Sequence, residues 1–96
     1  MDNFIYQPPQ EPLRIIHEDR DIVVVNKRSG VLSVSSKTHL DSIEYRLQSY
    51  YREKKNNLHI YVVHRLDMDT SGIIVFALRK KAERELKKQF MERRSL

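Results

Sequence analysis

The sequence contains no cysteine, only two glycines and three prolines, and no long apolar run among its 96 residues. Without cysteine the chain can hold neither a disulfide framework nor a thiolate metal site or nucleophile, and a reducing compartment fits this composition. The lack of an apolar run of about 18 residues excludes a membrane-spanning helix. The N-terminal residues also lack the basic and apolar regions of a secretory signal. We therefore expect a soluble, cytoplasmic chain. We also expect a monomer, although none of these absences bears on the oligomeric state.

What the chain does contain is a concentrated positive charge. The net charge of +5 comes from 18 basic and 13 acidic residues. The first 78 residues carry ten of each, so the excess lies in the last 18, where eight basic residues face three acidic ones. A basic stripe of this kind favours a polyanion such as RNA as the partner, although a solvated helix face has the same pattern.

The apolar periodicity predicts one small domain that contains both strands and helices. All three prolines fall within residues 1–12, which predicts an extended lead-in there, followed by a domain over 13–96. The predicted elements are, in order, strands over 13–18, 22–26 and 31–34, a helix over 42–51, strands over 58–63 and 73–77, and a basic helix over 79–94. The strand over 73–77 is almost wholly apolar, so we expect it to be central.

The ends of the first helix can also be predicted. Asp41 with Glu44 three residues later resembles a capping box, so we expect Asp41 to be the N-cap. Leu40, Ile43 and Leu47 recur at helical spacing and predict the buried face. Two one-faced helices cannot cover both faces of an apolar sheet, and we therefore expect part of the sheet to stay uncovered.

The loop over 64–72 concentrates chemically active groups between the two most apolar strands. It holds His64, Arg65, Asp67, Asp69 and a closing glycine within nine residues. Four interpretations remain open from the residues alone: a metal site, hydrolysis by paired carboxylates, a single carboxylate acting as nucleophile or base, and an ordinary polar turn. Its spacing matches no standard metal pattern, and polar turns of this kind are common.

Three segments of the sequence resemble the RluA family of RNA pseudouridine synthases. The strongest is His64-Arg65-Leu66-Asp67 with Thr70-Ser71-Gly72 before an apolar strand. The segment from Asn26 to Val34 is similar to the family's Asn-Lys-Pro-Ser-Gly segment, with Arg28 in place of the proline. The segment from Ala82 to Phe90 resembles the helix that follows the catalytic loop. The prolines near the N-terminus also resemble the lead-in of the short member that modifies both large-subunit rRNA and tRNA.

The resemblance implies a fold, a reaction and a set of site residues. It implies an α+β fold: the N-terminal part of a pseudouridine synthase catalytic domain, with a mixed, mainly antiparallel sheet and two flanking helices. The implied reaction isomerises uridine to pseudouridine in structured RNA, without metal or cofactor, with Asp67 as the catalytic aspartate. Arg65 would help to fill the place of the flipped base. The residues implied to shape the loop are His64, Leu66, Thr70, Ser71 and Gly72. Those expected to contact RNA phosphates from the basic helix are Lys80, Lys81, Arg84, Lys87 and Lys88.

The same resemblance implies that parts of the catalytic domain are absent. In the family, the helix leads into a strand with a tyrosine that packs on the target base, and a basic partner of the aspartate comes later. None of the five tyrosines lies after Asp67. We therefore expect a truncated domain that is inactive by itself. The alternative is a non-catalytic RNA-binding remnant that uses the basic helix over 79–94.

Overall fold

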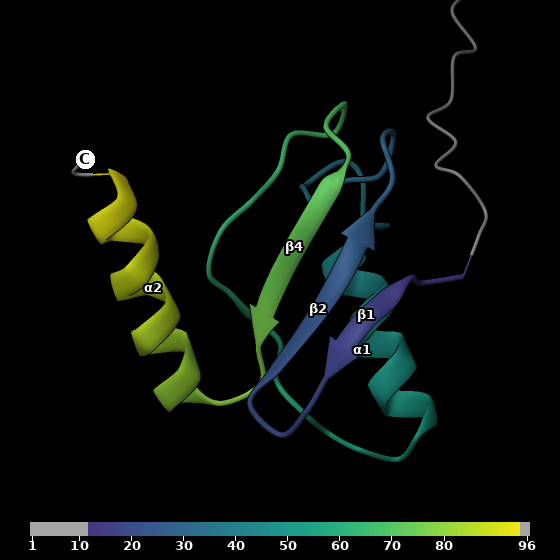
Figure 1. The fold of residues 1–96 in the computed structure, drawn as a ribbon. Coiled ribbons are helices and arrows are strands. Elements are labelled where there is room, and N and C mark those ends of the chain that lie inside the picture. Colours follow the sequence, from purple (N-terminus) through teal and green to yellow (C-terminus); the bar gives the residue numbers. More distant parts are fainter. Residues whose placement is uncertain (1–11, 95–96) are drawn as a thin grey trace, which may run out of the picture.

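A computed structural model describes residues 12–94, and the prediction for the lead-in falls mostly outside this range. The elements follow the order β1 (Ile15–Glu18), β2 (Ile22–Lys27), α1 (Ile43–Glu53), β3 (Tyr61–Val62), β4 (Gly72–Ala77) and α2 (Lys80–Arg94) (Figure 1). The strands form one sheet in the order β1-β2-β4-β3, and each neighbouring pair is antiparallel. The predicted α+β class is confirmed, and β4 occupies an interior position as expected.

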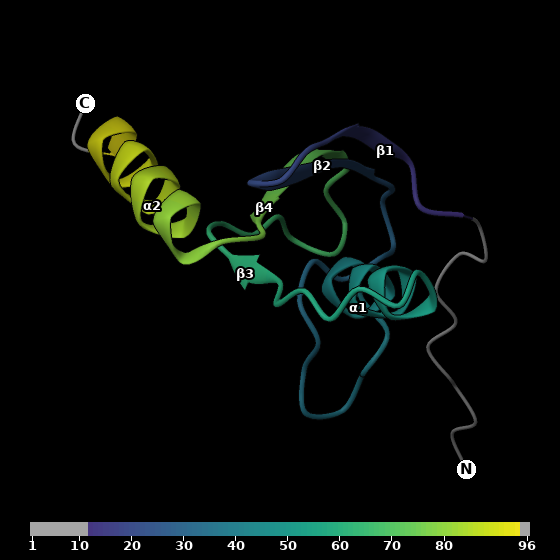
Figure 2. The same ribbon diagram turned by 90° about the horizontal axis from the view of Figure 1, so that it is seen from below.

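The core lies between one face of the sheet and helix α1. Alternate residues of a strand share a face, so Val23 and Val25 of β2 lie on the same face as Phe76 and Ile74, which they oppose on β4. All four side chains are fully buried. Helix α1 covers this face, as seen in Figure 2, and contributes the buried set Ile43, Leu47 and Tyr51.

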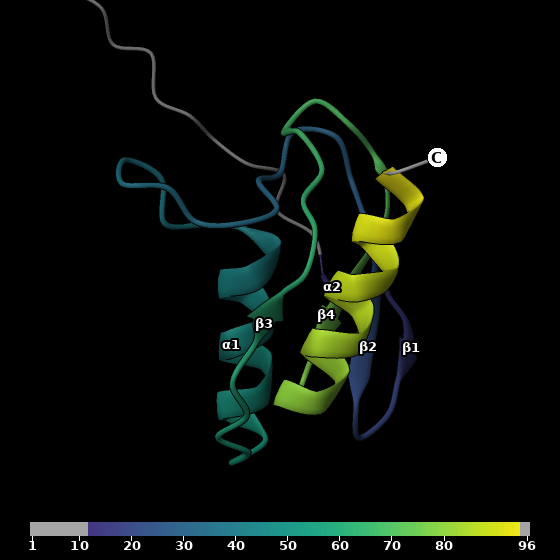
Figure 3. The same cartoon turned by 90° about the vertical axis from the view of Figure 1, so that its left-hand side faces the viewer.

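The opposite face of the sheet stays partly open, as predicted. Ile16 of β1 and Ile73 of β4 are each 54% exposed. Helix α2 does not cover them, because it lies beside the β4 and β3 side of the sheet and contacts mainly those two strands (Figure 3). No helix among residues 12–94 is both long and apolar enough to cross a membrane.

The predicted strand over 31–34 is wrong, because this segment supports helix α1 instead of joining the sheet. The carbonyl of Leu32 accepts a hydrogen bond from the Ile43 amide at 2.8 Å, and that of Ser33 accepts one from the Glu44 amide at 3.1 Å. The first amides of a helix lack partners within the helix itself. The carbonyl groups of this segment therefore accept hydrogen bonds from the first amides of α1, and they are not available for pairing with a neighbouring strand.

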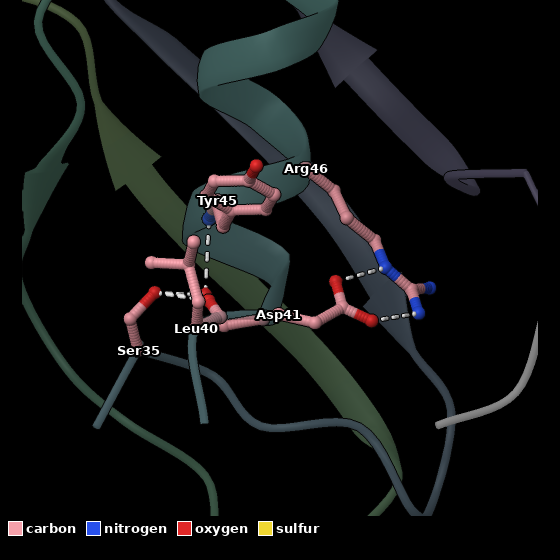
Figure 4. A network of polar contacts seen from close by, with 6 residues as sticks. Ser35, Leu40, Asp41, Tyr45 and Arg46 are labelled. Carbon is pink, nitrogen blue, oxygen red and sulfur yellow. Dashed lines mark hydrogen bonds and ion pairs between the residues drawn. The ribbon is translucent and has the colours of Figure 1, made fainter. Parts of the chain in front are cut away.

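The predicted N-cap of α1 is also wrong, by one residue. The cap is Ser42, whose hydroxyl accepts from the Tyr45 amide at 3.0 Å. Asp41 instead binds the Arg46 guanidinium with both carboxylate oxygens, at 2.9 and 2.8 Å (Figure 4). Leu40, expected on the buried face, is 61% exposed because it lies before the helix begins.

The strand predicted over 58–63 is reduced to the two residues of β3. Leu58 and Ile60 pack on the core without pairing with β4. The basic helix begins at Lys80, one residue later than predicted.

Candidate active site

The loop between β3 and β4 lies at one end of the sheet, next to the segment over 27–33 that follows β2. In Figure 1 both turns stand at the same end of the molecule, where β2 ends and β4 begins. The antiparallel pairing explains this, because the last residue of β2, Lys27, lies opposite the first residue of β4, Gly72. Two segments separated by about forty residues in the sequence thus meet at one sheet end.

Lys27, whose side chain is fully buried, holds the loop in place through its ammonium group. Its Nζ donates to the carbonyl oxygens of Thr70 at 2.5 Å, Met68 at 3.1 Å and Arg28 at 3.2 Å. An ammonium has three donors, and a buried charge is tolerated when all of them are used. Burial lowers the pKa of Lys27, while the nearby charges of Asp69 and Asp67 act in the opposite direction. Two of its three bonds hold the backbone of the loop.

Lys27 is a site residue that was not predicted, although the sequence carries a signal for it. Val23 and Val25 alternate on the buried face of β2, and Lys27 continues this two-residue period. The predicted strand over 22–26 ends one residue before it. A charged residue at the next buried position of an apolar strand is a direct indication of a paired internal charge.

Serine hydroxyls and one glycine complete the support of the loop. The buried Ser33 hydroxyl donates to the Leu66 carbonyl at 2.7 Å and accepts from the Leu66 amide at 3.0 Å. Ser29 donates to the Asp69 carbonyl at 2.9 Å, and the Gly30 amide donates to Met68 at 2.8 Å. Gly30 has a φ of 96°, which side-chain-bearing residues adopt only at a cost. The segment over 27–33 therefore binds the loop on both sides of Asp67.

Asp67 lies exposed at the centre of this supported loop. Its own carbonyl accepts from the Thr70 amide at 3.0 Å, which closes a tight turn over 67–70. Arg65 and Asp69 are exposed as well. The backbone is thus fixed around the carboxylate, while the side chain remains accessible to a large substrate.

His64 anchors the beginning of the loop to the sheet and to α2. Its Nε2 accepts a hydrogen bond from the Val75 amide at 3.0 Å, and its ring stacks on Phe90 with centroids 4.4 Å apart. Burial lowers the pKa of His64. The ring is therefore engaged with β4 and α2. A separate finding concerns metals: among residues 12–94, no three histidine or carboxylate side chains lie close enough together to hold a metal ion.

The other residues expected to shape the loop act in different ways. Leu66 packs on the core and is held by Ser33. Gly72 has a φ of 150°, and a Cβ there would lie 3.6 Å from the Leu66 side chain. Thr70 acts through its backbone, as donor to Asp67 and acceptor of Lys27. Ser71 is exposed.

The expected RNA-contacting residues of α2 are all exposed, and they differ in their neighbours. Lys81, Arg84 and Lys88 line an open groove of about 610 Å³, together with Arg79, Asp21 and Glu85. Lys87 instead binds Glu83 at 3.0 Å, one helical turn away. Lys80 begins the helix at the end of the molecule opposite the loop (Figure 1). The five residues recur at spacings of three, four and seven, so they all lie on the exposed side of the helix, with Lys81, Arg84 and Lys88 toward the groove.

The family model of RNA pseudouridylate synthase matches residues 21–96, which include the whole of this site. The chain belongs to this family. The resemblance of the loop over 64–72 to a pseudouridine synthase is therefore confirmed at the level of the family.

Named relatives and a solved structure agree with this membership. Dual-specificity RNA pseudouridine synthase RluA of Salmonella typhi is 55% identical over 91 residues, and that of Escherichia coli K12 is 54% identical over 91 residues. The Haemophilus influenzae protein of the same name is 51% identical over 89 residues. The structure of human RNA pseudouridylate synthase domain containing 1 matches with a TM-score of 0.67 and 29% identity, over 92% of this chain and 31% of that one. Against the Salmonella and E. coli relatives the match covers 92% of this chain but only 39% of the relative's length.

Proposed function

We propose that this pseudouridylate synthase family member isomerises uridine to pseudouridine in structured RNA, and that Asp67 is its catalytic carboxylate. The observation that carries the proposal is the loop itself. Asp67 is exposed, whereas the backbone before and after it is held by Ser33 and Lys27. A catalytic group needs this combination, because it must reach the substrate from a position that does not shift.

The reaction requires one bond to break and another to form on the same ribose. The bond from N1 of uracil to C1′ breaks, the base turns, and C5 bonds to C1′. The proton on C5 is released to solvent and N1 gains one, so the atoms balance without a redox partner. A carboxylate at Asp67 supports this by attacking the ribose or by removing a proton from it.

Arg65 completes the proposed site by replacing the base that leaves the stack. A uridine inside folded RNA must flip out before its C1′ can be reached, which costs a few kcal/mol. A planar guanidinium can stack on neighbouring bases and bind phosphate. Arg65 is exposed two residues before Asp67, so it suits this role.

Helix α2 is proposed to bind the phosphate backbone through its groove side. Lys81, Arg84 and Lys88 recur three and four residues apart, so they share one side of the helix. Phosphate contacts supply affinity and salt dependence, whereas sequence choice comes from contacts with bases. The location in the cytoplasm and the monomeric state stay predictions.

A matched pair of double variants tests the RNA-binding side of α2. We expect Lys81→Gln with Lys88→Gln to weaken RNA binding and to reduce the slope of log Kd against log salt by about 1.4 to 1.8. Lys80→Gln with Lys87→Gln removes the same charge from the same helix and should change the slope less. Fluorescence anisotropy of a labelled stem-loop over a series of salt concentrations gives both slopes. Equal slopes for the two variants would show that the groove is not the RNA-binding side.

A chimera tests the proposed activity. Residues 1–96 are joined to the part of the E. coli relative that this chain does not cover. We expect the chimera to release tritium from transcripts that carry 5-tritiated uridine, because C5 loses its hydrogen in the reaction. We also infer that residues 1–96 alone release none, since they match only 39% of that relative. A folded chimera that binds RNA without turnover would favour a non-catalytic RNA-binding role.

A further inference from the structure

The contact between His64 and Phe90 joins the proposed catalytic loop to helix α2. The two ring planes are inclined by only 20°, so the rings lie nearly face to face. The hydrogen bond from the Val75 amide to Nε2 fixes the other side of the same imidazole. Because Nε2 is the acceptor, the neutral ring carries its hydrogen on Nδ1. The imidazole is thus held by a strand and by a helix at once.

Phe90 lies where a movement of α2 would reach the loop over 64–72. The helix presents Ala82, Leu86 and Phe90 as a half-buried stripe, while most of its other side chains are exposed. Phe90 lies in the last turns of the helix, which run toward the end of the molecule where the loop stands (Figure 1). Phe90 is the residue of this stripe whose ring stacks on His64 of the loop.

We propose that Phe90 is a positioning residue that sets the geometry of Arg65 relative to Asp67 by orienting His64. The inference rests on the proposed function, and it adds a route by which α2 acts on catalysis. Phe90 touches no substrate in this scheme. It holds the imidazole, and the imidazole holds the start of the loop.

The neighbours of Arg65 explain why this contact matters. Leu66, on one side, is fixed by the two hydrogen bonds with Ser33. His64, on the other side, is fixed by Val75 and Phe90. With Leu66 anchored, a shift of His64 is absorbed at Arg65, which lies between these two residues in the chain, so the direction of its side chain changes. RNA that binds α2 would thereby influence the loop through one ring contact.

Substitutions at Phe90 separate positioning from simple packing. Phe90→Leu keeps an apolar side chain and removes the stacked ring, whereas Phe90→Tyr keeps the ring. We expect Phe90→Leu to lower kcat of the chimera about 10- to 100-fold, which is the range for a small misplacement of reacting groups. Its Kd for RNA should change far less than kcat, because the phosphate contacts of α2 remain, and Phe90→Tyr should keep kcat near the parent value. Ala82→Gly loosens the same helix without touching the ring and serves as the control.

Amide hydrogen exchange and amide NMR signals of the 96-residue chain provide the second readout. We expect Phe90→Leu to speed hydrogen exchange of the Val75 amide, because its bond to His64 loosens, and to move the Arg65 amide signal, with Phe90→Tyr close to the parent chain. The proposal is overturned if Phe90→Leu lowers only the melting temperature, as Ala82→Gly does, and leaves kcat and both amide readouts unchanged. An inactive parent chimera would count against the proposed function, and the NMR signals would then decide the positioning role alone.

Discussion

Replacing Asp67 with asparagine in the chimera is expected to abolish tritium release while RNA binding persists. Asparagine keeps the shape of the side chain but can neither attack the ribose nor accept its proton at neutral pH. The size of the loss also distinguishes the two roles. Loss of a general base costs about 10²- to 10⁴-fold, whereas loss of a nucleophile can cost on the order of 10⁶-fold.

Asp69 provides the matched control for this substitution. It is an exposed carboxylate two residues away in the same loop, so Asp69→Asn removes the same charge. We expect the activity of Asp69→Asn to stay near that of the parent chimera. Neither change should alter stability by more than about 0.5 kcal/mol, as is usual for exposed positions. If Asp69→Asn were inactive and Asp67→Asn active, the catalytic assignment would move to Asp69.

Replacing Lys27 with methionine is expected to cost both stability and activity. Methionine keeps most of the apolar stem and removes the ammonium, so the Thr70 carbonyl loses its donor. A buried polar group without a partner costs about 1–3 kcal/mol. Relief of the buried charge offsets part of this cost. The loop also loses the bond to Met68, and a displaced Asp67 should lower kcat by about 10- to 100-fold.

Urea unfolding of the chain and kcat of the chimera measure the two effects of Lys27→Met. Lys37→Met is the control, because Lys37 is an exposed lysine and its substitution should change neither quantity. Hydrogen exchange adds a local readout, since the Gly30 amide donates to the same Met68 carbonyl and should exchange faster in Lys27→Met. Parent-like stability together with parent-like kcat would show that the buried ammonium does not hold the loop.

The parts of the fold that follow from local pattern were predictable. The apolar run of β4 predicted an interior strand, and the spacing of Ile43 and Leu47 predicted the buried side of α1. The segment over 31–34 was not predictable in this way. Its residues have the composition of a strand, but its carbonyls are engaged by the first amides of α1. That choice depends on where the helix lies in three dimensions.

The residues of the candidate loop could be predicted from the sequence, but the contacts that hold the loop in place could not. The motif around Asp67 is continuous in the sequence, so the loop could be named before the structure. Lys27 and Ser33 act on it from more than thirty residues away. Such contacts are created by the register of β2 on β4, which a single sequence does not specify. The stack of His64 on Phe90 depends likewise on three-dimensional packing, here of α2 beside β4 and β3.

The imidazole of His64 also has a consequence for the edge of the sheet. Strand β3 pairs with β4 only at Phe76 and Ala77, so it leaves the Val75 amide without a strand partner. An unpaired row of amides along a strand invites pairing with another chain. The Val75 amide donates to a side-chain nitrogen of His64. The amide is therefore already occupied, and the imidazole has no backbone groups with which another strand could pair. We therefore expect the residue that begins the loop also to hinder another chain from pairing with this part of β4.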